Sequence, residues 1–233
     1  MDDILDPFEI RVLAVLAEKE GLTPDNYPLS LNALTNGCNQ LSSRDPVMQL
    51  SEDTVADVLA RLTEKKLVNS VNQSGSRVTK YEHRMRIKWS LEQDKVAIMA
   101  ILMLRGLQTA GEIRTRSGRL YEFKSVAEVE TGLQFLMDKY PPLVASVQAP
   151  GTREPRYGQL LGGEESLARD ATAGAYGGSA HAPAGAGGGT AGGGRSGGAD
   201  SERVAALERE VHALRAEMSA LTAAFIAFKR SFE

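Results

Sequence analysis

A short pattern occurs twice in this chain, and the two copies are 76 positions apart throughout. The paired positions are Leu67 and Leu143, Val68 and Val144, Ser70 and Ser146, Val71 and Val147, Gly75 and Gly151, Arg77 and Arg153, and Tyr81 and Tyr157. In each copy, β-prone residues lie on both sides of a glycine, which predicts two strands joined by a turn. A repeat of this length indicates two copies of one structural unit.

Three helical patterns precede each predicted hairpin. They lie at residues 8–20, 29–34 and 51–62 in the first copy and at residues 93–104, 108–113 and 125–136 in the second. Ser51 and Ser125 stand where the third helix of each copy begins, as N-caps, and Glu128 adds the spacing of a capping box. Three helices followed by a hairpin is the order of a winged helix-turn-helix. The sequence therefore predicts an α+β, mostly helical fold with two tandem winged helix-turn-helix domains.

The domain boundaries follow from this order and from composition. Residues 1–89 are predicted to form the first winged-helix domain and residues 90–165 the second. Residues 166–200 are predicted to be a disordered Gly/Ala-rich linker, because the stretch 171–199 has little to bury in return for lost chain entropy. Residues 201–233 are predicted to be a C-terminal coiled-coil helix.

The predicted coiled coil is defined by a heptad pattern of apolar residues. Its core positions are Val204, Leu207, Val211, Leu214, Met218, Leu221, Phe225, Phe228 and Phe232. Valine at a and leucine at d favour a parallel two-stranded coil, so a homodimer is expected. The phenylalanines are bulky for a dimer, which leaves a trimer or an antiparallel coil open. A helix that folds back onto its own chain is the further alternative.

Composition bounds the class of protein. With 42% apolar and 24% charged residues, the chain has enough apolar side chains for two small cores. No apolar run approaches the ~20 residues that span a bilayer, and the N-terminus is acidic, unlike a secretory signal. The single cysteine, Cys38, has no partner for a disulfide or a metal site and is expected to be a small buried residue. We therefore expect a cytoplasmic protein with no membrane contact, no metal site and no cofactor.

Two long segments resemble a known family. Residues 27–40, which read Tyr-Pro-Leu-Ser-Leu-Asn-Ala-Leu-Thr-Asn-Gly-Cys-Asn-Gln, continue through 42–47 and are similar to the YceH family of bacterial proteins. Residues 104–120 are similar to the second hallmark of that family, and the resemblance extends over residues 4–162. It implies a tandem winged-helix fold in the cytoplasm and no established biochemical activity.

The third helix of each copy is acidic outside its apolar stripe. These positions include Asp53, Asp57 and Glu64 in the first copy and Glu128, Glu130 and Asp138 in the second. An acidic helix is repelled by the phosphates that line the major groove and gains nothing from counterion release. In the first copy, Arg61 and Lys65 also lie outside the stripe, so it is the third helix of the second copy that is not expected to read bases, although such reading is usual for winged helices.

Basic residues gather in the first wing and around the second middle helix. The candidates for contact with DNA phosphates are Arg77, Lys80, Arg84, Arg86, Arg114, Arg116 and Arg119. Alternation along a strand places Arg77, Thr79, Tyr81 and His83 on one face, which suits a wing lying along a phosphate backbone. The alternative is that these charges solvate a surface or pair with the acidic helices.

The segment 36–46 is polar and aperiodic. Its candidate recognition or partner-binding residues are Asn36, Asn39, Gln40, Arg44 and Asp45. Amides and hydroxyls in such a segment also satisfy helix ends and turn backbones, which is the alternative interpretation.

Two functions from different classes remain. The first is a non-enzymatic, dimeric DNA-associated protein of transcription regulation, which contacts the phosphates of double-stranded DNA and gains affinity from its two copies. The second is a module that binds another protein through winged-helix surfaces without nucleic acid. No acid–base pair, nucleophile elbow, phosphate-binding loop or metal motif is present, so no catalytic residue is predicted. The first function is preferred on the analogy of the fold.

Overall fold

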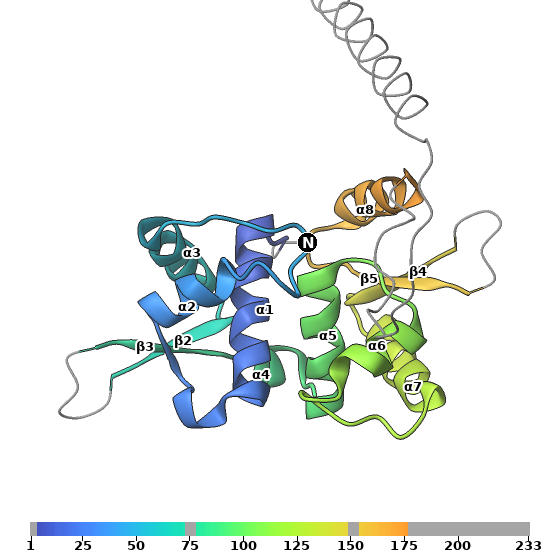
Figure 1. The fold of residues 1–233 in the computed structure, drawn as a ribbon, viewed down its shortest axis with the longest axis horizontal. Helices are drawn as coiled ribbons and strands as arrows, with labels where there is room; N and C mark the ends of the chain where they lie inside the picture. The colour runs from blue at the N-terminus through green and yellow to red at the C-terminus, as the bar shows by residue number, and fades with distance from the viewer. Residues whose placement is uncertain (1–3, 73–77, 149–153, 177–233) are drawn as a thin grey trace, which may run out of the picture. The chain divides into compact units, whose positions relative to one another are not determined.

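The structure is a computed structural model that describes residues 4–72, 78–148 and 154–176 (Figure 1). The chain divides into two compact parts, Met1–Ala180 and His181–Glu233. The second part, which contains the predicted heptad helix, lies outside the described residues, and so do Arg77 and most of the predicted linker.

The first part contains two successions of three helices and a hairpin, and each succession is one unit of the repeat. The first succession consists of α1 (Pro7–Leu22), the short 3-10 helix η1 (Pro24–Asn26), β1 (Leu29–Ser30), α2 (Leu31–Cys38), α3 (Glu52–Glu64), β2 (Val68–Val71) and β3 (Lys80–His83). A short helix, α4 (Met85–Trp89), leads to the second, which consists of α5 (Gln93–Arg105), α6 (Ala110–Ser117), α7 (Val126–Met137), β4 (Val144–Val147) and β5 (Arg156–Gln159), followed by α8 (Glu164–Tyr176). The described part of the chain is therefore α+β and mostly helical, as predicted.

The two hairpins are equivalent strand for strand. In the first, β2 pairs antiparallel with β3 and Val68 lies opposite His83. In the second, β4 pairs antiparallel with β5 and Val144 lies opposite Gln159. Both strands of the second hairpin begin 76 positions after their counterparts, and β2 and β4 alternate between buried and exposed positions in the same order. The repeat predicted from the sequence is confirmed in these strands.

A third strand pairing was not predicted. The first hairpin is extended by β1, in which Leu29 lies opposite Tyr81. In the second succession the equivalent contact is a single bridge, in which Gln108 and Tyr157 exchange backbone hydrogen bonds of 3.0 and 2.7 Å. Both contacts join the residues just before the middle helix to the second strand of the hairpin.

Short polar side chains fix where the helices begin. The hydroxyls of Ser51 and Ser125 accept hydrogen bonds at the starts of α3 and α7, as predicted. The capping box predicted at α7 is wrong, because Glu128 accepts from the backbone N–H of Lys124 at 2.7 Å instead of from Ser125. Glu128 therefore fastens the turn in front of the helix.

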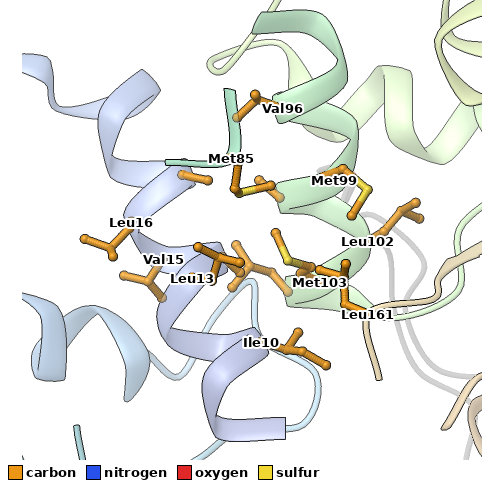
Figure 2. Packing of buried hydrophobic residues seen from close by; sticks show 14 of the residues in the cluster. Ile10, Leu13, Val15, Leu16, Met85, Val96, Met99, Leu102, Met103 and Leu161 are labelled. Atoms are coloured by element: carbon orange, nitrogen blue, oxygen red, sulfur yellow. The ribbon is translucent and has the colours of Figure 1, made fainter. Parts of the chain in front are cut away.

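Helices α1 and α5 pack against each other and join the two successions in one hydrophobic core. Figure 2 shows side chains from both helices, among them Leu13 of α1 and Met103 of α5, filling the space between them. Both helices are buried on nearly all sides, and even charged Arg11 of α1 is only 1% exposed. The hairpins project from opposite sides of this helix pair (Figure 1).

The prediction of a disordered linker from residue 166 onward is wrong for residues 166–176, which belong to helix α8. Leu167 of α8 is 9% exposed and lies against Gly158 of β5, where the absence of a Cβ leaves space for it. Because Leu167 packs against a strand and not against the apolar stripe of another helix, helical periodicity in the sequence does not reveal this contact. No helix among the described residues is long and apolar enough to cross a membrane.

Candidate nucleic-acid interface

The third helix of each succession presents acidic side chains to solvent. On α3, the exposed residues include Glu52, Asp53, Asp57 and Glu64. On α7 they include Glu130, while Phe135 and Gln134 on the same helix are exposed without a charge. These carboxylates repel phosphate, so the exposure of Glu130 is consistent with the expectation that α7 does not read the major groove.

The strand face that carries Tyr81 and His83 turns toward the protein interior. Nε2 of His83 lies 3.1 Å from Oε2 of Glu20. Nδ1 of the same ring accepts a hydrogen bond from the N–H of Met85 at 3.2 Å. The hydroxyl of Tyr27 accepts from the N–H of His83 at 2.7 Å. The prediction that this face lies along a phosphate backbone is wrong for His83, because its buried ring anchors the hairpin to Glu20 of α1.

The contact with His83 also changes the acidity of Glu20. The hydrogen bond from His83 lowers the pKa of Glu20, with burial opposing the shift and the charges of His83 and Arg86 adding to it. Arg86 lies 3.4 Å from the same carboxylate and is hydrogen-bonded to Gln93. The guanidinium of Arg86 is thus already engaged within the chain.

The other predicted phosphate contacts differ in how far they are engaged. Lys80 and Arg84 are partly exposed, and neither side chain has a hydrogen bond or ion pair among the described residues. Arg119 is exposed, and it too has none within that part of the chain. These three cations are available for an external anion.

Arg114 and Arg116 lie on α6 and have intrachain contacts. Arg114 donates to the backbone oxygens of Phe123 and Lys124, each at 3.3 Å, and so braces the turn before α7. Arg116 lies 3.9 Å from Glu112, a carboxylate that also binds Arg156 at 3.2 Å. Since Glu112 is shared, Arg116 is only weakly neutralised.

The polar segment 36–46 is held from inside by two buried arginines. Arg44 has a fully buried side chain and donates to Glu18 at 2.6 Å, to the Gly37 oxygen at 3.0 and 3.1 Å and to the Gln40 side chain at 2.7 Å. Arg11 donates to the backbone oxygens of Cys38 and Pro46 at 3.1 and 2.6 Å. These contacts satisfy the end of α2, so Arg44 is inaccessible to an external partner.

The amide side chains of this segment are also engaged. Asn39 exchanges two hydrogen bonds with the backbone of Leu50, at 2.8 and 2.7 Å, and closes the loop before α3. Asn36 donates to Asn32 at 3.2 Å, and Asn32 donates to Glu52 at 2.8 Å, which links α2 to α3. Asp45 keeps an exposed side chain and uses its N–H to bind the Leu104 oxygen at 2.8 Å.

Arg105 is a site residue that the predicted set lacks. It ends α5 and donates to the hydroxyl of Ser43 at 2.6 Å, across the junction between the two successions. The sequence carries one signal for it, since Arg105 belongs to the second hallmark segment and Ser43 to the first.

A groove lies beside the second hairpin. Its volume is about 700 Å³, and its lining is mostly apolar, with Val144, Val147, Leu160 and Leu167 among the side chains. Within the described ranges, no three His, Cys, Asp or Glu side chains are placed to hold a metal ion.

The fold and these contacts define a mostly helical α+β protein made of two equivalent units joined through α1 and α5. The family described as "Protein of unknown function, DUF480" matches residues 5–152. A UPF0502 protein of Herminiimonas arsenicoxydans is 58% identical over 231 residues, covering 99% of this chain and 91% of the relative. A UPF0502 protein of Azoarcus sp. strain BH72 is 48% identical over 98% of this chain and 94% of the relative. The chain belongs to the DUF480 family, and the resemblance drawn from residues 27–47 and 104–120 is confirmed.

Proposed function

We propose that the two units are winged helix-turn-helix domains of a non-enzymatic DNA-associated regulator, which contacts phosphates through its hairpins and the surface around α6. The observation that carries this proposal is the set of exposed or partly exposed cations that have no partner among the described residues, Lys80, Arg84 and Arg119, on two equivalent units of this architecture. Long cationic side chains of this kind make the phosphate contacts that position a protein on DNA.

The acidic surfaces of α3 and α7 define the mode of binding. Phosphate contact requires only cations along the backbone, whereas base reading requires a helix or ribbon inside a groove. The protein is therefore expected to bind duplex DNA with little discrimination between sequences. A homodimer formed by residues 201–233 would supply two copies and raise the weak affinity through effective concentration.

Fluorescence anisotropy on random duplex DNA at ~50 mM salt tests the proposal, because each neutralised phosphate contributes about −0.9 to the slope of log affinity against log salt. The double variant Lys80→Ala/Arg119→Ala should flatten this slope by about 1.8. The matched control is Lys95→Ala/Arg61→Ala, which removes the same charge from residues already paired with Asp94 at 3.0 Å and Asp6 at 2.9 Å. Equal slopes for the two double variants, or no binding by folded protein at tens of micromolar, would refute phosphate contact.

A second candidate function is a protein-binding module. The observation that favours it is the exposed acidic surface of α3, made by Glu52, Asp53, Asp57 and Glu64, which complements a basic partner segment. Pull-down from native lysate with and without nuclease separates the two candidates. A partner that survives nuclease treatment and is lost in Asp53→Lys/Asp57→Lys supports the protein-binding module, and a partner that nuclease removes supports DNA association.

A further inference from the structure

The two hallmark segments of the sequence meet at the junction between the two units. The N–H of Asp45 donates to the Leu104 oxygen at 2.8 Å. Arg105, one residue after Leu104, donates from Nη2 to Oγ of Ser43, two residues before Asp45, at 2.6 Å. Ser43 and Asp45 of the first hallmark segment therefore lie against Leu104 and Arg105 of the second, although the two segments come from different units.

Arg105 stands out among the arginines at this junction. Arg44 has the carboxylate of Glu18 at 2.6 Å, and Arg11 has two backbone oxygens. No carboxylate among the described residues lies within ion-pair distance of Arg105. The hydroxyl of Ser43 accepts a hydrogen bond from its guanidinium. The guanidinium fork offers five N–H donors, so most of its donors remain for a ligand.

The charges that surround Arg105 are mostly positive. Burial lowers the pKa of Arg105, and the charges of Arg116 and Arg44 lower it further. Glu18 acts in the opposite direction, and because it is paired with Arg44 the two charges largely offset each other, which leaves the repulsion from Arg116. An anion bound to Arg105 would relieve this repulsion.

The backbone on both sides holds the donors in place. Ser43 has a φ of 62°, a left-handed conformation that is unfavourable for a residue with a Cβ and is found at sites where the surrounding structure enforces it. Its carbonyl oxygen accepts from Nη1 of buried Arg44 at 3.0 Å, which fixes the turn. Gly106, with a φ of 68°, turns the chain immediately after Arg105.

We propose that Arg105, Arg116 and the hydroxyl of Ser43 form a phosphate-binding site at the junction of the two units. Arg105 presents its planar fork to two phosphate oxygens, the hydroxyl of Ser43 donates to a third, and the positive charge of Arg116 favours the bound anion. The inference rests on the proposed function for naming the DNA backbone as the source of the phosphate. A free phosphate or a nucleotide monoester has the same chemistry and is the other source.

The test uses the full chain and two probes. Inorganic phosphate is titrated at constant ionic strength while the guanidinium NMR signals are followed, and random duplex DNA is titrated by anisotropy over a range of salt. The variants are Arg105→Gln, Arg116→Gln and Ser43→Ala, with Lys95→Gln as the charge-matched control whose cation is already paired. Arg116 and Ser43 are exposed, so their variants keep the test valid if Arg105→Gln fails to fold.

The outcomes separate the site from the proposed function. We expect the Arg105 signals to shift saturably with phosphate, and we expect this response to fall at least tenfold in Arg116→Gln and Ser43→Ala but not in Lys95→Gln. In Arg105→Gln, the guanidinium signals of Arg116 should no longer shift saturably with phosphate. If the DNA salt slope also flattens by about 0.9 in Arg116→Gln, DNA is the source. A phosphate response with an unchanged DNA slope supports the site with a free phosphate ligand and counts against DNA contact there. No response to either probe in the wild-type protein overturns the inference.

Discussion

Arg44 and Glu18 form a buried ion pair, with hydrogen bonds of 3.1 and 2.6 Å between the guanidinium and the two carboxylate oxygens. The Arg44 side chain is 0% exposed and that of Glu18 is 9% exposed. The pair joins the polar segment after α2 to the helix α1 that packs against α5. One of the two segments that resemble the family is therefore bound to the core helix α1.

Replacement of Arg44 by methionine should destabilise the protein strongly. Removal of one partner leaves a buried charge on Glu18 and an unsatisfied oxygen on Gly37, and such losses cost about 3–5 kcal/mol. The double variant Arg44→Met/Glu18→Met should recover part of this loss, because no buried charge is left alone. Urea unfolding followed by circular dichroism measures the effect, and Arg61→Met, which breaks an exposed pair with Asp6, should cost no more than about 1 kcal/mol. A loss from Arg44→Met as small as that of Arg61→Met would contradict this role.

The stability of the protein should fall in acid through Glu20. Because its pKa is lower in the folded protein than the ordinary value of 4.5, ionised Glu20 stabilises the fold above that value. This contribution should be lost as the pH falls from about 4.5 through the lowered folded pKa. Glu20→Gln should cost about 1.5–3 kcal/mol at pH 7, because it weakens charge-assisted hydrogen bonds. It should also flatten the fall of Tm below pH ~4.5, whereas the exposed control Glu64→Gln should follow the wild-type curve.

Cys38 should be unreactive in the native protein. Burial raises the pKa of its thiol to about 12, although the charges of Arg11 and Arg44 oppose the shift. At pH 8 the thiolate fraction should then be on the order of 1,000-fold below that of a free cysteine with a pKa near 8.5. Iodoacetamide labelling followed by mass spectrometry should be correspondingly slow in native buffer and fast in guanidinium chloride. Similar rates in both solvents would show that the α2 region opens readily.

The local features of the fold were predictable because each of them is encoded by neighbouring residues. The constant offset of 76 positions predicts both hairpins, and the hydroxyls of Ser51 and Ser125 mark the starts of α3 and α7. The buried placement of Cys38, which is 0% exposed, also agrees with its prediction. Such signals need only strand alternation, helical period and cap chemistry.

The features that were missed depend on contacts between distant residues. The packing of α1 on α5, the burial of Arg44 against Glu18 and the docking of Leu167 on Gly158 all join residues that no local pattern relates. The same holds for the candidate site, because the role of Arg105 appears only when residues 43 and 105 are brought together. The sequence alone does not show whether a cationic side chain pairs with a carboxylate inside the protein, as Arg44 does, or is available to bind an external anion.

The assembly of the protein should depend on the heptad pattern in residues 201–233. Leu214 occupies a d position, so Leu214→Asp would place a charge in the seam of the coil without a partner and should convert the oligomer to monomer. Light scattering of the full chain at micromolar concentration measures the change, with about twofold loss of mass expected for the homodimer and threefold for a trimer. Ser219→Asp is the matched control, because it introduces the same charge at an outer b position and should leave the mass unchanged. Since paired chains bind DNA with raised effective concentration, Leu214→Asp should also weaken duplex binding more than Ser219→Asp does. A wild-type chain that is already monomeric at this concentration would refute the coiled-coil prediction and favour a helix that folds back onto its own chain.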